Sequence, residues 1–415
     1  MKSVKVKFSY TWIIIALCFL MVFTCLGFCS TTRSLYLVPI TEALGIPRSV
    51  FSLAESCQYV TTAIVNLFFG TLISRFGTKK LIGAGFSSLI IAMLLHAYTG
   101  VVWVFYLGSV FLGIGLSWTT TTMVGCIVNK WCQEKQGVIM GVVLAANGVG
   151  AAFATQIVSP MIYQKDNAFG YRDSYKMIVW ILIALFILFM VFYKDKEPAH
   201  TYKASEVSRK YGSDAEVFRE FIRKPYFYVV IVCVFLSGGI LQGIYGVFPA
   251  YMKDMGLEPT YVVLLVSVCS LMLAVAKFLT GVVYDKCGLR FVASSCYVLA
   301  IVSMLLLLLI KATELGRVLA LIYTIIYPFS IPLLTVILPF FAKDIFNPRA
   351  YNLTLGLLVS VNTAGYACGI PLINWVFDVC GSYKPIFFIS SIIMSAVTIC
   401  FQFVVSTSKK ISRNG

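Results

Sequence analysis

Three ionisable side chains lie inside apolar stretches of the chain and are the first candidates for chemistry: Arg33, Glu55 and Lys277. An ionisable side chain at the centre of a membrane helix costs about 2.5 to 3.5 kcal/mol on insertion scales, so each needs a partner or a polar cavity. Arginine offers a carboxylate two parallel hydrogen bonds, whereas lysine acts as a point charge. We expect Arg33 and Lys277 to bind an anion, with Glu55 as their counter-ion or as a proton-coupling carboxylate.

A structural role is the alternative for each of these residues. Arg33 would then pair with Glu55, or extend to the outer membrane interface, and would only hold two helices together. Lys277 would extend to the cytoplasmic surface, although eight residues separate it from Asp285. That separation corresponds to a depth of roughly 12 Å at 1.5 Å per residue. The sequence leaves both interpretations open.

Polar and aromatic residues on other apolar runs are candidates to complete the site, because pockets combine aromatic walls with a few placed polar groups. Each of them alone is more often a packing residue or an interhelical hydrogen bond. We expect about half of them to face a cavity. The candidates are Trp118, Thr121, Asn147, Gln242, Tyr245, Tyr327, Asn362 and Tyr366.

Proline and glycine predict bends in two of the helices that carry these candidates. Tyr327-Pro328 and Pro332 lie within one apolar run, and Gly369-Ile370-Pro371 lies within another. Such positions break or kink membrane helices. We expect a bend in each helix that gating movements could use, with a static kink as the alternative.

The composition identifies the environment of these residues. Of 415 residues, 60% are hydrophobic and 12% are charged, whereas a soluble domain carries about a quarter charged residues. This excludes a soluble globular protein. The net charge of +16 would suit nucleic acid only on the basic face of a soluble fold, so we expect no nucleic-acid partner.

Twelve apolar runs predict an all-α membrane protein, because each can cross a hydrocarbon core of about 30 Å. They lie at roughly 11–37, 50–73, 81–99, 101–128, 137–163, 175–193, 227–251, 260–284, 291–310, 316–342, 353–377 and 385–406. The only long polar stretch separates the sixth run from the seventh. We predict two six-helix bundles, residues 1–193 and 226–415, joined by a cytoplasmic loop at 194–225.

Basic residues predict the orientation of the chain in the bilayer. If the N-terminus is cytoplasmic, the inner segments carry 23 Lys and Arg residues and the outer segments carry eight. Cytoplasmic loops retain Lys and Arg, so we expect both termini in the cytoplasm. The compact loops favour a bacterial inner membrane, and we expect a protein that functions as a monomer.

The sequence shows no constellation typical of an enzyme. Thirteen cysteines are scattered without metal-ligand spacing, and the two histidines, His96 and His200, are far apart. We therefore predict no metal centre, no cofactor and no nucleophile with a paired base. A nucleotide-binding loop is also missing, which excludes a primary pump.

The basic N-terminus and first apolar run resemble a signal sequence, but the run is too long and ends in Arg33.

Two loops repeat one pattern at equivalent places in the two predicted bundles. The first loop contains Gly70, Ser74, Arg75, Gly77 and Lys79, and the second contains Gly281, Asp285, Lys286, Gly288 and Arg290. All five positions are displaced by 211 residues. Because transporter folds are commonly built from duplicated bundles, we predict an internal duplication.

These loops resemble the signature loop of the major facilitator superfamily, G-x-x-x-D-R-x-G-R/K, which lies between helices 2 and 3 and is weakly repeated between helices 8 and 9. The resemblance implies a secondary transporter made of two pseudo-symmetric six-helix bundles. In physical terms, the glycine lets two helices approach and the basic cluster holds the loop at the inner interface. Ser74 departs from the usual aspartate of this loop, whereas Asp285 keeps the acid in the second half.

Two further segments resemble the monocarboxylate transporters and oxalate/formate antiporters within that superfamily. They are Asn129-Lys130-Trp131 followed by Gly137 and Gly141, and Gly170-Tyr171-Arg172. In those families a cation on helix 1 and another on helix 8 engage a substrate carboxylate. The segment from Gly27 to Ser34 with Arg33, and Lys277 with Gly281 and Asp285, match those two patterns.

Two coupling residues of those families are absent. Leu273 stands where proton-coupled monocarboxylate transporters carry an aspartate, and Gly365 stands where the antiporters carry a helix 11 lysine. We therefore predict a secondary transporter of small organic anions, mono- or dicarboxylates, that works by alternating access and favours anion exchange. The alternatives are a proton-coupled carboxylate symporter that uses Glu55 and a non-transporting membrane nutrient sensor.

Overall fold

The computed structural model describes residues 10–131, 136–164, 167, 169–194, 225–344 and 351–414, and none of these residues lies in a strand. The helices follow one another along the chain with short connections. In order they are α1 (Tyr10–Leu26), the π-helix η1 (Gly27–Thr31), α2 (Arg33–Leu44), α3 (Arg48–Leu67), α4 (Phe69–Phe76), α5 (Thr78–Tyr98), α6 (Val102–Thr119), α7 (Thr121–Trp131), α8 (Gln136–Ile162), α9 (Gly170–Phe192), α11 (Pro225–Asp254), α12 (Pro259–Leu309), α13 (Glu314–Ile326), the 3₁₀ helices η2 (Tyr327–Phe329) and η3 (Ile331–Leu334), α14 (Ile337–Asp344), α15 (Tyr351–Cys380) and α16 (Lys384–Asn414).

These helices make twelve membrane crossings. Within the described residues, ten helical stretches are long and apolar enough to span a bilayer. One of them, α12, has 51 residues and is broken at Gly288, and at 1.5 Å per residue it is too long for a single crossing of about 30 Å. The pair α3 and α4 supplies the remaining crossing, whose hydropathy is lowered by Arg48 and Glu55. The predicted twelve-helix, all-α membrane fold is confirmed.

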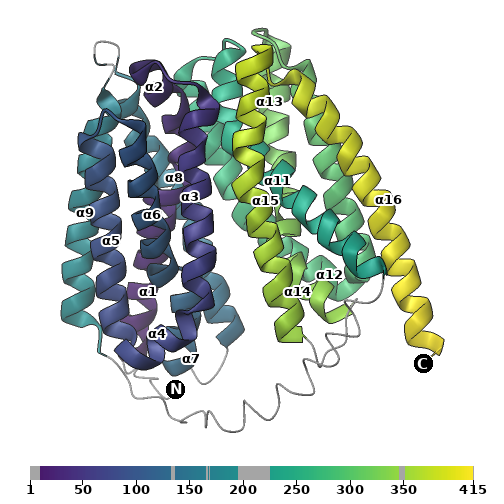
Figure 1. The fold of residues 1–415 in the computed structure, drawn as a ribbon, viewed down its shortest axis with the longest axis horizontal. Coiled ribbons are helices and arrows are strands. Elements are labelled where there is room, and N and C mark those ends of the chain that lie inside the picture. Colours follow the sequence, from purple (N-terminus) through teal and green to yellow (C-terminus); the bar gives the residue numbers. More distant parts are fainter. Residues whose placement is uncertain are drawn as a thin grey trace, which may run out of the picture.

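The helices form two groups that lean together at one end (Figure 1). One group contains α1 to α9 and the other contains α11 to α16, and the start of α1 and the end of α16 lie at the end where the groups diverge. We call this end the terminal side and the opposite end the Arg48 side. Helix α3 packs on α15, and α8 packs on α12, so these two pairs join the groups. The predicted linker lies almost wholly outside the described residues, so its boundaries at 194–225 stay a prediction.

The duplicated loops form the same backbone turn in each half. Gly77, between α4 and α5, has φ 78° and ψ 164°, and Gly288, inside α12, has φ 76° and ψ 174°. Glycine adopts positive φ without the steric cost that a Cβ would bring. The same unusual conformation 211 residues apart supports the predicted duplication. The surroundings of Gly70 and the side chain of Ser74 fall outside the described part of the structure.

Three other motif residues, Lys130, Arg290 and Arg172, make hydrogen bonds at helix ends. Lys130 donates a hydrogen bond from Nζ to Thr78 Oγ1 at 2.6 Å, which ties α7 to the start of α5. Arg290 donates from Nε to Gln402 Oε1 at 2.7 Å, which ties α12 to α16. Arg172 donates to the carbonyl of Thr99 at 3.1 Å. These residues position helices and do not approach the centre of the molecule.

One of the two predicted bends coincides with a break in the helix, whereas the other lies within a continuous helix. After Ile326 the chain passes through η2 and η3, which carry Pro328 and Pro332, before α14 begins. Helix α15, in contrast, runs unbroken through Pro371. A break that the sequence did not predict is the π-helix η1, where Thr31 Oγ1 donates to the carbonyl of Leu26 at 3.1 Å. Such π segments are frequent at functional sites.

The glycines before Pro371 serve close packing between helices. A Cβ built on Gly369 of α15 would collide with the carbonyl oxygen of Gly239 in α11. A Cβ on Gly365 would collide with the carbonyl oxygen of Phe235. Small residues let membrane helices approach this closely. The antiporters' lysine therefore has no room at Gly365.

Replacing Gly369 should test this contact. We expect Gly369→Ala to destabilise the folded protein by about 1–3 kcal/mol, because overpacking forces the two backbones apart. The control is Gly356→Ala on the same helix, where a Cβ meets no atom within 4 Å. Thermal unfolding of both variants in detergent would measure the difference. Equal midpoints for the two variants would show that the close approach of α11 and α15 is not required.

Candidate functional site

A cavity of about 200 Å³ lies between the two groups of helices and brings the predicted charges together. We call it the central cavity. Seven of the candidate residues line it: Arg33, Glu55, Asn147, Gln242, Tyr245, Lys277 and Tyr366. The lining also includes polar residues that the sequence did not single out: Ser30, Thr31, Ser34, Gln58, Tyr59 and Thr335. All of them except Thr335, which follows η3, lie within about one helical turn of a predicted residue.

Arg33 is held by neutral partners. It is the first residue of α2 and follows the π-helix η1. Its Nη1 donates to Gln58 Oε1, and its Nη2 lies 3.4 Å from Ser109 Oγ. Gln58 and Ser109 are buried. The guanidinium is thus oriented by hydrogen bonds to uncharged groups, which leave its positive charge in place.

The expected ion pair between Arg33 and Glu55 is not formed. Both side chains line the central cavity, yet among the described residues neither has an ion-pair partner. Gln58, one turn further along α3, takes the place next to the guanidinium that the carboxylate was expected to fill. Glu55 therefore remains a partly buried carboxylate whose oxygens accept no hydrogen bond from the described part of the chain.

Lys277 lies in the same cavity from the other group of helices. It is located in the first half of α12, and its side chain lines the central cavity rather than only a lipid-facing surface. No ion pair or hydrogen bond joins it to a described residue. The central cavity thus holds one cation from each group and one acid. Such charges in a low-dielectric bundle require compensation from a ligand, an ion or water.

Two amide side chains of the cavity lining have one partner each. Asn147 Oδ1 accepts a hydrogen bond from Thr31 Oγ1 at 3.4 Å, and Gln242 Nε2 donates to the hydroxyl of Tyr59 at 3.1 Å. One end of each amide therefore has no partner within the described residues. The ring of Tyr59 also meets the ring of Tyr366 edge to face, with centroids 5.3 Å apart. These contacts join α3 to α11 and α15 beside the cavity.

Four candidate residues do not line the central cavity. Tyr327 is fully buried and donates its hydroxyl proton to the carbonyl of Leu241. Asn362 is buried and donates to the carbonyl of Leu334 at 3.1 Å and to the hydroxyl of Tyr366 at 2.7 Å. Trp118 packs beside Gly85 of α5. Thr121 is exposed at the first residue of α7.

A larger apolar groove, of about 510 Å³, lies between α11 and α16. Its lining includes Val232, Cys233, Ile393 and Val397. It has no charged group and no amide to hold a polar solute. Among the described residues, moreover, no group of three or more His, Cys, Asp or Glu side chains is placed to bind a metal ion. The central cavity is therefore the candidate functional site.

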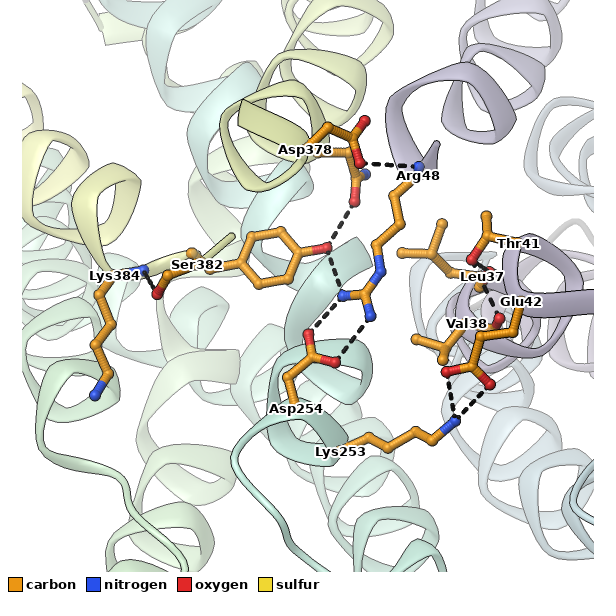
Figure 2. A network of polar contacts seen from close by, with 12 residues as sticks. Leu37, Val38, Thr41, Glu42, Arg48, Lys253, Asp254, Asp378, Ser382 and Lys384 are labelled. Carbon is orange, nitrogen blue, oxygen red and sulfur yellow. Dashed lines mark hydrogen bonds and ion pairs between the residues drawn. The ribbon is translucent and has the colours of Figure 1, made fainter. Parts of the chain in front are cut away.

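The Arg48 side is closed by a polar network that the sequence did not predict (Figure 2). Arg48 forms a bidentate ion pair with Asp254 at the end of α11, with distances of 2.5 and 2.8 Å. The side chains of Arg48 and Asp254 are 11% and 22% exposed, so solvent screens the pair only weakly. Lys253 adds an ion pair with Glu42 at 3.1 Å. Both pairs join the two groups of helices.

The same network also caps the N-terminus of α3 with an acid from α15, which belongs to the other group of helices. Helix α3 begins after Pro47, which provides no side-chain cap, so its first backbone N–H groups need external acceptors. Asp378 of α15 accepts the N–H of Arg48 at 3.1 Å and the N–H of Ser49 at 2.9 Å. A carboxylate at a helix N-terminus also interacts favourably with the helix dipole. Arg48, Asp254, Asp378, Glu42 and Lys253 form what we call the gate network.

Polar contacts between the groups extend from the gate network to the central cavity. Ser56 donates to the carbonyl of Ala367, and Gln242 donates to Tyr59. On the other pair of helices, Gln156 donates to Ser267 at 2.9 Å. These contacts lie between the Arg48 side and the level of the cavity, whereas the groups diverge toward the terminal side (Figure 1). The structure is therefore the state closed on the Arg48 side.

Comparison with known proteins identifies the family. Residues 12–351 match the sequence profile of the Major Facilitator Superfamily, which is most of the chain. The chain belongs to the Major Facilitator Superfamily. The members of this superfamily are membrane transporters, and the predicted multi-pass membrane protein of this superfamily is confirmed.

Relatives of this Major Facilitator protein have diverged widely. It is similar to the sialic acid transporter NanX of Escherichia coli (strain K12), with 23% identity over 269 residues, which cover 61% of each chain. It is also similar to YcxA of Bacillus subtilis (strain 168), described as an uncharacterized MFS-type transporter, with 25% identity over 42% of each chain. The chain thus aligns with less than two thirds of the length of these relatives.

Solved structures share the fold of this Major Facilitator protein across nearly its whole length. The nucleoside transporter NupG matches with a TM-score of 0.78 and 12% identity, over 95% of this chain and 99% of the NupG chain. A bacterial homologue of the human lysosomal transporter Spinster, in an inward-facing and occupied conformation, matches with a TM-score of 0.71 and 14% identity, over 97% of each chain. At these identities the likeness concerns the fold alone.

A double-mutant cycle should measure the strength of the gate network. We expect Arg48→Ala and Asp254→Ala to be coupled by about 1–3 kcal/mol, because both charges are largely buried and in bidentate contact. The matched control is Arg317 with Glu314, an exposed pair at 2.9 Å, whose coupling should stay below about 1 kcal/mol. Unfolding free energies in mixed micelles would provide both values. Equal coupling in the two cycles would contradict the gate's role in closing this side.

Proposed function

We propose that the protein is a secondary transporter that moves a small organic anion, a mono- or dicarboxylate, by alternating access around the central cavity. The observation that carries this proposal is that Arg33 and Lys277 come from different groups of helices, line one cavity and have no ion-pair partner among the described residues. An anion in the cavity would compensate both charges. It would also connect the two groups through one ligand.

The same charges favour exchange over net uptake. When the cavity is empty, closing it on both sides buries two cations and only one acid, which is costly. A bound anion lowers that cost, so the occupied carrier changes state more readily than the empty one. A ligand can shift this equilibrium only through such a difference in its interaction with the states.

The relatives are compatible with this substrate class without determining it. NanX is named a sialic acid transporter, and sialic acid is itself a carboxylic acid. NupG is named a nucleoside transporter, and a nucleoside is uncharged. The finer assignment to the monocarboxylate transporter and oxalate/formate antiporter branch rests on the short motifs at Asn129 and Gly170 and on the two cavity cations.

Proton symport through Glu55 is the second candidate mechanism. Glu55 lines the cavity beside Arg33 and has no ion-pair partner in the described part of the chain. A membrane-embedded carboxylate of this kind is a common element of proton relays. In this mechanism a proton would enter with the anion and neutralise Glu55 when the carrier closes.

The orientation and the membrane are part of the proposal. The excess of basic residues in the segments that the sequence predicts to be cytoplasmic supports a cytoplasmic location for the terminal side, in a bacterial inner membrane. The structure would then be the state closed to the outside. We further propose that a single chain transports, because the central cavity is formed entirely within one chain.

Removing the Lys277 charge should abolish transport. We expect Lys277→Gln to lower the uptake of carboxylates into proteoliposomes to background, because the anion loses its partner on one group of helices. The control is Lys311→Gln, where the lysine is exposed and outside the cavity. Circular dichroism and thermal unfolding would verify that both variants fold. Unchanged uptake by folded Lys277→Gln would exclude this residue from the site.

Glu55→Gln should separate exchange from symport. If the protein exchanges anions, this variant should retain counterflow driven by internal carboxylate. If it is a symporter, wild-type uptake should rise when the outside is made acidic, and Glu55→Gln should lose that response. Uptake measured with and without a pH gradient, and with and without internal carboxylate, distinguishes the two mechanisms.

A further inference from the structure

The central cavity offers more hydrogen-bonding partners than a simple carboxylate can use. We infer that its substrate is a hydroxylated monocarboxylic acid, an acid of the sugar-acid class, rather than a plain fatty acid, a dicarboxylate or a neutral nucleoside. This inference rests on the proposed function and specifies the substrate class of the same site. It uses the charge balance of the cavity, its unpartnered polar groups and its size.

The charge balance favours one carboxylate. Arg33 and Lys277 are positive and Glu55 is an acid, so the lining carries one net positive charge when Glu55 is ionised. One substrate carboxylate neutralises this charge. A second carboxylate would add an uncompensated negative charge to a cavity that already contains Glu55, which is costly where the dielectric constant is low. A neutral substrate would leave the excess positive charge uncompensated.

The unpartnered polar groups favour hydroxyls on the substrate. The Glu55 carboxylate and one end of each amide, Asn147 and Gln242, have no partner among the described residues. A hydroxyl can donate to a carboxylate and can also accept from, or donate to, an amide. A hydrogen bond to an ionised acceptor is about twice as strong as one between neutral groups. Asn147 and Gln242 lie on different groups of helices, so a hydroxylated chain would reach both.

The remaining lining suits the carbon skeleton of a small molecule. Leu273, Ile331 and the ring of Tyr245 supply apolar surface next to the polar groups. The volume of about 200 Å³ is below the roughly 300–1,000 Å³ typical of drug-sized ligands. The cavity therefore fits one small acid with several hydroxyls. A fatty acid with the same number of carbons would bury Glu55, Asn147 and Gln242 without hydrogen bonds. Burying polar groups without partners costs binding free energy, so we expect such an acid to bind weakly.

Matched acids test this inference. Gluconate and hexanoate have the same number of carbons and one carboxylate, but only gluconate carries hydroxyls. We expect gluconate to raise the thermal unfolding midpoint of the purified protein and to bind at least about tenfold more tightly than hexanoate. Succinate tests the single-carboxylate requirement, and glucose tests the carboxylate itself. Both should bind at least about tenfold more weakly than gluconate.

The outcomes separate this inference from the proposed function. If hexanoate or succinate binds as tightly as gluconate, the hydroxylated monocarboxylate is wrong and anion transport stands. If glucose binds as tightly as gluconate, or if no acid binds and none is taken up by proteoliposomes, the proposed function itself is overturned.

Two variants locate the recognition in the cavity. Glu55→Gln should reduce the preference for gluconate over hexanoate by about tenfold, because the ionised acceptor is lost. Glu314→Gln changes the same type of side chain, 87% exposed at the start of α13, and should keep the full preference. Lys277→Gln should weaken both acids alike. An unchanged preference in folded Glu55→Gln would overturn the role of Glu55 in recognising hydroxyls.

Discussion

Two positive side chains between the two groups of membrane helices have no acidic partner among the described residues, and the organisation of the site follows from this imbalance. Arg33 and Lys277 face one cavity from opposite groups, and neither forms an ion pair with a described residue. Gln58 and Ser109 orient Arg33 without neutralising it. A stable structural ion pair would have used these charges to hold the bundle together. Their separation instead leaves them available to a ligand, which is the physical basis of the proposed transport.

Helix α3 connects the cavity to the closed side. Its N-terminus is capped by Asp378, its first residue pairs with Asp254, and the same helix carries Glu55 and Tyr59 about two and three turns later. A helix is rigid over this distance, so a movement of the cavity lining is transmitted to the gate network. Opening the Arg48 side must therefore break a buried ion pair and uncap α3 together. We therefore expect the Arg48 side to open in one cooperative step, in which the ion pair and the cap of α3 are lost together.

Local turn chemistry was predictable wherever a few neighbouring residues determine the backbone. Gly77 and Gly288 form the same positive-φ turn because only glycine adopts it without strain, and their 211-residue spacing is visible in the sequence. A proline within a helix need not end it when neighbouring helices hold the backbone, and α15 continues through Pro371. The π-helix at η1 and the glycine contact between α11 and α15 depend on packing partners distant in the sequence.

Hydropathy and charge act on each segment alone, so the twelve crossings, the family and the charges that must be accommodated could be inferred from the sequence. Which residues share the cavity depends on how the helices pack, and so required the folded structure. It placed Tyr327 and Asn362 in packing roles, added Gln58 and Tyr59, and separated Glu55 from ion-pair contact with Arg33. Arg48 counted in the sequence only as an outer basic residue. Its partners lie 206 and 330 residues away along the chain, and such pairings follow from how helices assemble.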